Sequence, residues 1–579
     1  MKEYLKIKSS AHYGILNELT TIYHGDQSIQ LKGIHSYKLL EILFPILDGT
    51  KTLEDLVNIF GPERRIVIQN LLSQLVKKNM IQVLKKVSWE AATCAAERNL
   101  LDYLSDHYDN PNDRLYSIKN ARAYLIGKNN LSKSIRESLS HYQIEITEFG
   151  DMHEFEQVVS NERVRDNSIV IYSFEKMDNY LIEYISNYCK KTGITLATVG
   201  ICGNYTVIGP IQYADSPCLS CLIQRNIEVK HKQSLLERTI EFDVSPLHLS
   251  LAGAYLAFQI IRFIASDNGH LDYKCELIEN AVILNTETLE LEVVPVEIHP
   301  KCKVGHSASS DSLLKTEYDK VINWIRNPYV GLVVEPDAQT MVQLPLRLHK
   351  LHYLKSSKIV VGCGEKIDSA KEAAYLQTIE MDLQSDHSKL KRLNINAADE
   401  KSIIVDRDNE SVLNKICNYL GEKLFLTSVL QKEKIQTLDV DFLLSGEWSR
   451  LMKIISVGFC HSVEIVGYRR LGEHFFTVGT RLNQRDKNKS NNESQFRDKI
   501  FVGSGTTLEE AMFKSLLHGT ASLQALYQNK SNSEIVINLS AEWGKPKTEE
   551  NFEQILTDLN KMGYKVHLKQ FKDFAIGWI

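Results

Sequence analysis

Between residues 121 and 201 the chain alternates short apolar runs with amphipathic stretches, and this alternation restricts the possible folds more than any other feature. The runs ARAYLIGK, QIEITEFG, NSIVIYSF and ITLATVGI have the character of buried strands. LSKSIRESLSHY and MDNYLIEYISNYCKKTG lie among them with helical spacing, and the second ends at Gly193. Strands that alternate with helices predict a doubly wound, largely parallel sheet.

The first 85 residues predict a separate small unit. The stretches YLKIKSS and SIQLKGI alternate apolar and polar side chains, as half-buried strands do. Three stretches with helical spacing follow, namely SYKLLEILFPILDGT, TLEDLVNIFG and ERRIVIQNLLSQLVKKN, before MIQVLK returns to a strand pattern. This order indicates a winged-helix arrangement over residues 1–85. A helix and a turn-rich linker are expected over residues 86–118.

The C-terminal part of the chain holds an internal repeat. VGCGEKIDSAKEAAYLQTIEMDL, which begins at Val361, matches VGSGTTLEEAMFKSLLHGTASLQ, which begins at Val502. In both copies a Gly-x-Gly pair precedes a helical pattern. We expect two related α+β lobes, over residues 317–435 and 436–579, after a linker at 303–316. Because 579 residues are too many for one hydrophobic core, the whole is expected to be an α/β and α+β multidomain protein.

Two thiols three positions apart follow the predicted sheet in SPCLSCLIQRN. A tight turn with Cys-x-x-Cys presents both sulfurs, here of Cys218 and Cys221, to one ion, and Zn²⁺ prefers thiolate and imidazole ligands. Cys302 is the expected third ligand, with His306 or His299 as the fourth. Unliganded thiols are the alternative, and a thioredoxin-like redox pair is less favoured because such motifs open a helix directly after a strand. A closed site without an open coordination position would make the Zn²⁺ structural.

The turn after the first strand of the predicted sheet is where such a fold binds a nucleotide, because glycines there let backbone amides approach phosphate. The turn reads YLIGKNNLSKSI, in which Gly127 is followed by the bulkier Lys128, Asn129 and Asn130. We therefore expect no nucleotide at this turn.

The Gly-x-Gly pairs of the repeat are weak phosphate signals and are interpreted as tight turns. On the helix of the first copy, Glu380 and Asp382 are candidate Mg²⁺ ligands, but a solvated face is the favoured interpretation. Their counterparts in the second copy, Ala521 and Leu523, are apolar.

Charge and cysteine usage exclude several classes of protein. The formal net charge of −5 argues against a nucleic-acid binder, which normally has a basic balance. The N-terminus lacks an apolar signal core, and no run approaches a membrane span. Ten scattered cysteines without an export signal indicate reduced thiols. We expect a cytoplasmic protein without nucleic-acid or membrane partners, and a homodimer is left open.

Together these parts resemble ThiF-like maturation proteins of thiazole-containing bacteriocins and thiopeptides. LDGTKTLEDLVNIFG and the third helix resemble a PqqD-like precursor-recognition element. Residues 119–302, with IGPIQYADSPCLSC and HPKC, are similar to the ThiF/MoeB-type adenylating fold of cyclodehydratase partner proteins, whose PCLxC and HPxCxxC motifs supply four zinc cysteines. The C-terminal lobes are similar to a YcaO domain, whose GxG…A…AlxEaiER helix matches Gly362 to Met381.

This resemblance implies a non-catalytic subunit. It would bind the leader of a ribosomally made precursor peptide and present the peptide's core to a partner YcaO cyclodehydratase for thiazoline formation. A flavin-dependent azoline dehydrogenase would then form the thiazoles. The alternative is an enzyme, namely an ATP-dependent azoline-forming cyclodehydratase that works alone or as half of a composite active site.

The resemblance also implies how the leader docks. It would add as a strand beside SIQLK and pack on the third helix, so that backbone hydrogen bonds give affinity and side-chain pockets give selectivity. The arginines of that helix would pair with carboxylates of an acidic leader. The expected leader-binding residues are Ser28, Ile29, Gln30, Leu31, Lys32, Arg64, Arg65, Ile68, Gln69 and Leu72.

Three positions depart from the family pattern. Gly305 stands where the fourth zinc cysteine would fall, so His306 is the expected substitute. Gln377 and Met381 replace the glutamate and arginine of the YcaO-type helix. The loss of that carboxylate removes a candidate Mg²⁺ ligand and points away from an independent catalyst.

Overall fold

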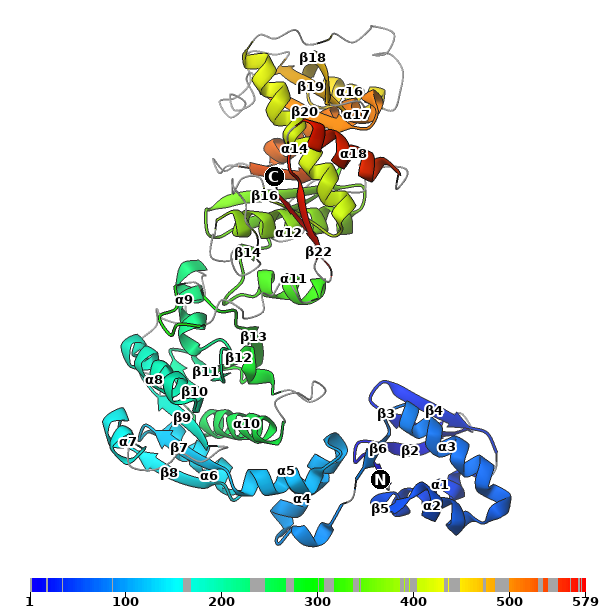
Figure 1. Ribbon diagram of the computed structural model, residues 1–579, viewed down its shortest axis with the longest axis vertical. Helices are drawn as coiled ribbons and strands as arrows, with labels where there is room; N and C mark the ends of the chain where they lie inside the picture. Colours follow the sequence, from blue (N-terminus) through cyan, green and yellow to red (C-terminus); the bar gives the residue numbers. More distant parts are fainter. Residues whose placement is uncertain are drawn as a thin grey trace. The chain divides into compact units, whose positions relative to one another are not determined.

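The protein is described by a computed structural model in which the chain forms two compact units (Figure 1). The first comprises Met1–Ser220, Leu235–Val296 and Lys303–Gly305, and the second Cys221–Ser234, Glu297–Cys302 and His306–Ile579. Most of the expected linker at 303–316 lies outside the described residues. The structure describes all positions except 1–2, 17–18, 34, 86, 160–167, 230–244, 267–274, 300, 307–316, 337–342, 344, 386–389, 391–394, 396–402, 432–435, 437–447, 472–474, 485–498, 529–534, 540–549, 563, 571–572, 574 and 579.

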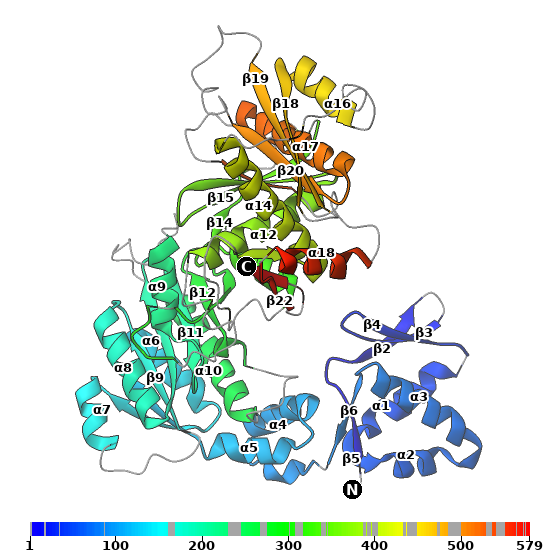
Figure 2. The same ribbon diagram turned by 45° about the horizontal axis from the view of Figure 1, so that its top comes forward.

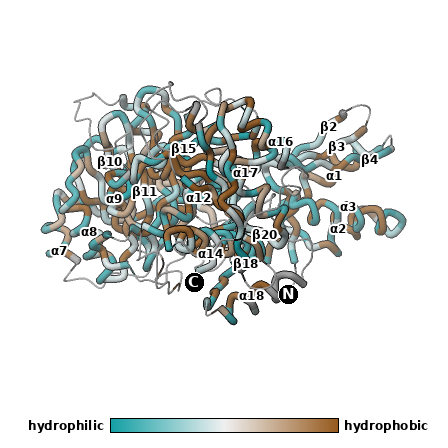
Figure 3. Tube along the Cα trace, turned by 90° about the horizontal axis from the view of Figure 1, so that it is seen from above, coloured by the Kyte–Doolittle hydropathy of each residue, from teal (hydrophilic) through white to brown (hydrophobic). Residues whose placement is uncertain are grey.

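The N-terminal part of the first unit has two three-stranded sheets, β5-β1-β6 and β2-β3-β4, and three helices. Thr52 and Asp55 form a capping box at the start of α2, which ends at Gly61. Helices α2 and α3 carry both hydrophobic and hydrophilic residues, as amphipathic helices do (Figure 3). The strands β2, β3 and β5 were not predicted. The elements are β1 (Tyr4–Ile7), β2 (His12–Leu16), β3 (Leu19–His24), β4 (Gln27–Leu31), α1 (Ser36–Ile46), β5 (Asp48–Thr52), α2 (Leu53–Phe60), α3 (Arg65–Lys77) and β6 (Ile81–Leu84).

The segment expected as a linker contains a second helix. α4 (Ala95–His107) is followed by α5 (Pro111–Lys119), in which Leu115 and Ile118 are buried. The sequence DNPND has the composition of a turn, but Pro111 occupies the first helical position, where its missing N–H costs nothing. The prediction of a linker was wrong for this stretch.

A seven-stranded sheet forms the centre of the first unit, in the order β13-β12-β11-β10-β9-β7-β8. The pairs β7–β8, β7–β9 and β9–β10 are parallel, as predicted, whereas β10–β11, β11–β12 and β12–β13 are antiparallel. The sheet is therefore mixed. Its strands are β7 (Arg122–Ile126), β8 (Glu145–Phe149), β9 (Ser168–Phe174), β10 (Thr195–Cys202), β11 (Tyr205–Gln212), β12 (Asn280–Asn285) and β13 (Leu291–Pro295).

Alternate residues of this sheet pack on opposite layers. Leu125 and Ile171 face one core with α6 (Asn130–Ser140) and α10 (Pro246–Ala265). Tyr124 packs on the other side, against Phe155 of α7 (Met152–Val159), near α8 (Asn179–Thr192). By length and hydropathy α10 is the single membrane-span candidate among the described helices. It nevertheless packs closely on α6, where Ser134 donates to the Leu249 carbonyl, so it is a core helix.

The second unit contains three sheets, β14-β15-β16-β21, β17-β23-β22 and β18-β19-β20, and α17 lies along the last of them (Figure 2). The C-terminal strands β21 and β23 pair with β16 and β17. The lobe boundary expected at 435/436 therefore does not separate the sheets. The elements are α11 (Tyr318–Arg326), β14 (Val333–Val334), β15 (Arg347–Tyr353), β16 (Lys358–Gly364), α12 (Ile367–Gln384), β17 (Ile404–Asp406), α14 (Asn409–Leu430), α16 (Trp448–Lys453), β18 (His461–Leu471), β19 (Phe475–Gln484), β20 (Ile500–Gly505), α17 (Leu508–Gln528), β21 (Ile535–Leu539), α18 (Glu550–Lys561), β22 (His567–Gln570) and β23 (Ala575–Trp578).

Both copies of the repeat form a strand followed by a helix, as predicted. The Gly-x-Gly residues, which were interpreted as tight turns, are instead the last three residues of each strand. The first glycine of each pair is a packing residue. A Cβ atom on Gly362 would collide with the Ala370 carbonyl oxygen of α12, and one on Gly503 would collide with the backbone of Ala511 and Ser515 in α17. These glycines thus let the helix lie directly on its strand.

Gly362→Ala is expected to lower the free energy of unfolding by about 3 kcal/mol, because the added methyl group overpacks the contact between β16 and α12. Urea denaturation measures the loss. Gly458→Ala is the matched control, since a Cβ atom there would meet no atom within 4 Å. Equal stability of the two variants would contradict this account of the repeat.

Candidate functional site

A cluster of three cysteines and one histidine follows the central sheet. Cys218 immediately precedes α9 (Leu219–Val229), Cys221 lies in its first turn, and Cys302 and His306 lie beyond β13. The four ligand atoms are all within 4.8 Å of one another, and the Cys221 sulfur is 3.4 Å from His306 Nε2. The structure thus brings together the four residues predicted as metal ligands, in a Cys₃His set that can hold a metal ion.

The donor set fits a tetrahedral Zn²⁺, which takes thiolate and imidazole ligands. Burial would lower the pKa of His306, but hydrogen bonds with Cys221 and Cys302 raise it to about 9. A cation bound between these ligands would replace that proton. His299, the alternative fourth ligand, is excluded because Nδ1 accepts from the Lys301 amide and Nε2 contacts Glu228.

A buried network of charges, which was not predicted, starts on the same helix. Arg225 of α9 contacts Glu228 at 2.8 Å and Glu297 at 3.5 Å. Lys355, after β15, lies 3.7 Å from Glu228 and 2.6 Å from Asp382 of α12. Burial raises the pKa of Glu228, but the hydrogen bond with His299 and the charges of Lys355 and Arg225 outweigh it and lower the pKa to about 2. This network ties α9 to α12.

The residues predicted to bind the leader differ in their exposure to solvent. β4 pairs with β3 alone and is the edge of its sheet, so its outer side is open to an added strand among the described residues. Ser28, Gln30, Lys32, Arg64 and Arg65 are exposed, while Leu31 and Gln69 are half-buried.

Three of the predicted leader contacts are core residues instead. Ile68 and Leu72 are 0% and 1% exposed, and Ile29 is buried as well. Ile68, Leu72 and Leu75 share the inner face of α3 at spacings of three and four, and this apolar periodicity marks the core-facing side of the helix. The prediction that Ile68 and Leu72 contact the leader is therefore corrected, because both side chains belong to the core.

The turn between β7 and α6 is occupied by side chains from the turn itself and from the end of β9. Asn129 caps α6 in a capping box with Ser132, and Glu175 accepts from the Asn130 amide at 3.2 Å. A polar cavity of about 460 Å³ opens here, lined by Lys128 and Glu175 among others. A phosphate at the helix N-terminus would therefore meet the Glu175 carboxylate.

Glu380 and Asp382 do not form the solvated face that was expected. Glu380 accepts from Gln377 and Gln384 side-chain amides and from the Val405 amide, at 3.2–3.3 Å. Burial raises the pKa of Glu380. Asp382, which is 3% exposed, pairs with Lys355. Sequence reasoning missed the burial of these side chains because the contacts with Val405 and Lys355 join segments that are distant along the chain.

Comparison with solved structures finds the same overall fold in heterocyclases. A heterocyclase in complex with substrate and cofactor matches at 12% identity with a TM-score of 0.54, covering all of this chain and 94% of that one. The heterocyclase TruD matches at 12% identity and 0.50, with the same coverage. E. coli MccB, in structures that include one with AMPCPP and MccA, matches 52% of this chain and 99% of its own at 13% identity, with a TM-score of 0.39. No family model and no curated protein matches. The chain thus has a heterocyclase-like fold along its whole length.

Proposed function

We propose that this chain takes part in azoline formation on a ribosomally made precursor peptide. The single observation that carries the proposal is the likeness of the entire chain, both C-terminal lobes included, to a heterocyclase described in complex with substrate and cofactor. The fold alone is alike at 12% identity, so the activity itself is what the experiment below must test.

Two roles in that reaction differ in their support. The full-length likeness favours an ATP-dependent cyclodehydratase, alone or as half of a composite active site, over the scaffold implied by the family resemblance. The scaffold is the second candidate, because the carboxylates that could serve a nucleotide or Mg²⁺ site already have partners within the protein. Glu380 and Asp382 are already engaged by amides and Lys355, and Glu175 occupies the turn where a nucleotide would approach the central sheet. As a scaffold the chain would deliver the peptide to a YcaO cyclodehydratase and a flavin-dependent dehydrogenase.

Mass spectrometry of precursor peptide incubated with the purified chain and ATP separates these roles. Loss of one water per ring, without any other protein, is expected of a cyclodehydratase. Unchanged peptide that loses water after a YcaO partner is added identifies the scaffold. Peptide that stays unchanged in both mixtures, and also after all the proteins encoded beside this chain are added, contradicts a role in azoline formation.

Leader binding is common to both roles, and we propose that the leader binds along β4 and the first turn of α3. Arg65→Glu or Leu31→Asp is expected to weaken binding of a labelled leader peptide about tenfold, because the first reverses a charge that would pair with acidic leader residues and the second puts a carboxylate beside the added strand. Fluorescence anisotropy measures the affinity. Arg98→Glu, an exposed arginine of α4, is the control. Leader affinity equal to that of the wild type in both variants would place the groove elsewhere.

Within the Cys₃His cluster we propose a structural Zn²⁺, because all four positions of a tetrahedral ion are filled by protein ligands and none is left for substrate. The cluster would hold the start of α9 and the 302–306 segment together. We propose no nucleotide at the β7–α6 turn, for the reason given above.

A further inference from the structure

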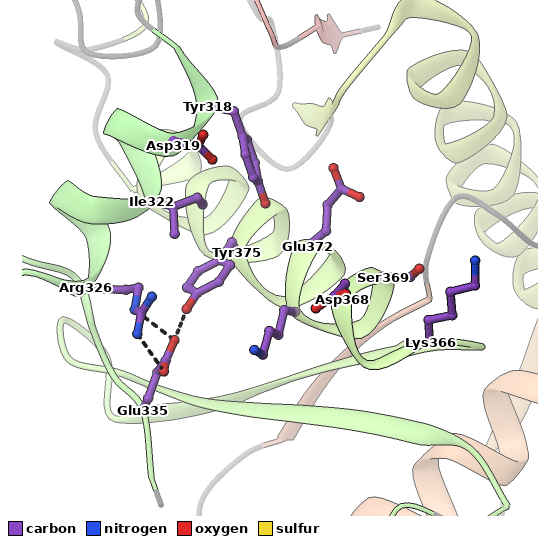
Figure 4. Close-up of a pocket in the computed structure, with 11 residues that line it drawn as sticks. Tyr318, Asp319, Ile322, Arg326, Glu335, Lys366, Asp368, Ser369, Glu372 and Tyr375 are labelled. Atoms are coloured by element: carbon purple, nitrogen blue, oxygen red, sulfur yellow. Dashed lines mark hydrogen bonds and ion pairs between the residues drawn. The ribbon is translucent and has the colours of Figure 1, made fainter. Parts of the chain in front are cut away.

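A cavity of about 530 Å³ lies between α11 and the N-terminal half of α12 (Figure 4). Its volume falls in the range of about 300–1,000 Å³ that is typical of small-ligand pockets. None of the residues discussed so far as leader, metal or Mg²⁺ ligands lines it. Tyr318 and Ile322 of α11 and Tyr375 of α12 supply its apolar walls, and charged side chains supply the remainder.

One end of the cavity carries a surplus of positive charge. The Glu335 carboxylate accepts from the Tyr375 hydroxyl and from Arg326, whose Nε is 3.1 Å away (Figure 4). His349 Nε2 lies 3.7 Å from the same carboxylate. Burial, and the charges of Lys371 and Arg326, lower the pKa of His349 to about 4, so the ring is neutral at pH 7. Lys371 also lines the cavity, and its charge acts on His349, so Arg326 and Lys371 oppose a single carboxylate in this part of the cavity.

The other end carries the opposite surplus. The side chains of Asp319 and Glu372 flank Tyr318 (Figure 4). Arg407 lies over the Tyr318 ring, 4.0 Å from its centroid, and 3.5 Å from Glu372. Two carboxylates and one cation therefore meet around one aromatic ring.

This distribution decides the class of ligand. The cavity is lined by three cations, Arg326, Lys366 and Lys371, and by four carboxylates, Asp319, Glu335, Asp368 and Glu372. Arg407, which pairs with Glu372, is a fourth cation, so the positive and negative charges are equal in number. A polyphosphate would bring several negative charges into a cavity whose own charges cancel, so a polyphosphate is a poor match. A ligand with one carboxylate and one positive or strongly polar end matches both ends at once.

We propose that this cavity binds the C-terminal end of the precursor peptide, with the free α-carboxylate at Arg326 and Lys371 and the preceding residues along Tyr318 and Tyr375. Arginine and lysine are the side chains that bind carboxylates, and capture of a peptide terminus is a recurring mode of recognition. This inference rests on the proposed function for the identity of the peptide. It adds a second contact, which would hold the end of the peptide that the leader does not.

The test uses the full chain and a probe that needs neither leader nor ATP. The pentapeptide Ser-Gly-Ser-Gly-Ser with a free carboxylate is titrated calorimetrically against its C-terminal amide. We expect the wild type to bind the free acid about fivefold more tightly than the amide, and Lys371→Glu to bind both alike. Lys320→Glu is the matched control, because Lys320 is an exposed lysine of α11 that does not line the cavity.

Equal affinity of the wild type for acid and amide would overturn the inference, and so would discrimination that survives in Lys371→Glu. Glycine that binds as tightly as the pentapeptide would make this an amino-acid site and would also overturn it. Thermal unfolding confirms that both variants are folded. The two proposals can fail separately. If the precursor peptide loses no water but the wild type still prefers the free acid to the amide, the proposed function is rejected and the cavity's specificity for carboxylates stands.

Discussion

Cys221→Ser is expected to lower the free energy of unfolding by about 5 kcal/mol or more, because structural Zn²⁺ supplies about 10–16 kcal/mol in zinc-finger peptides and a larger protein retains part of that effect. Cys221 is fully buried, so the serine also leaves a polar group inside the cluster. Removal of the metal by a strong chelator should produce a similar loss in the wild type. Urea denaturation and elemental analysis measure stability and metal content.

The cysteine at position 460 provides the control for this experiment. It is exposed and lies outside the cluster, so Cys460→Ser should keep both the metal and the stability of the wild type. We expect about one zinc per chain in protein purified without chelator, since one cluster of this kind is found in the described part of the chain. A metal content near zero would end the zinc proposal.

Lys355→Met is expected to destabilise the protein by about 3–5 kcal/mol, the cost of removing one partner of a buried ion pair. Lys355 contacts Asp382 at 2.6 Å, and their side chains are 12% and 5% exposed, so the remaining carboxylate would be left in a poorly solvated place. Lys453→Met, at an exposed lysine of α16, is the control. A double change, Lys355→Met with Asp382→Leu, should recover part of the loss because no buried charge is then unpaired.

Acid titration of the same variant gives an independent reading. Glu228 has a folded pKa of about 2, below its unfolded value of about 4.3, so its contribution is present above the unfolded value and is lost as the pH falls toward 2. Lys355→Met removes one of the charges that lower this pKa, and the loss should then begin at higher pH. Identical stability–pH curves for variant and wild type would contradict the role of Lys355.

The sequence predicted those features whose signals are local. Cys218 and Cys221 lie on one turn, and the spacing in the repeat at Val361 and Val502 predicts a strand and a helix in each copy. The charge network was missed because Arg225 and Lys355, which both contact Glu228, are far apart in sequence. The sequence around each of them does not indicate that its side chain is buried. Such pairs are set by the packing of distant elements.

Two errors have physical causes of the same kind. The α5 segment was taken for a linker because its asparagines and aspartates favour turns, whereas the contact with α10 and the burial of Leu115 decide for a helix. The α3 residues Ile68 and Leu72 were predicted to contact the leader because their spacing defines a face of the helix, but spacing does not state which side the core occupies.

The pairing of β21 with β16 has a consequence for the newly made chain. About 170 residues separate the end of β16 from the start of β21, and at ribosomal rates of about 5–20 residues per second their synthesis takes on the order of ten seconds or more. During that interval the edge of β16 that later pairs with β21 is unpaired, so it can pair with strands of other nascent chains. A chain released early, before residue 535, would keep that edge exposed, and a chaperone that shields it during translation would raise the yield of soluble protein.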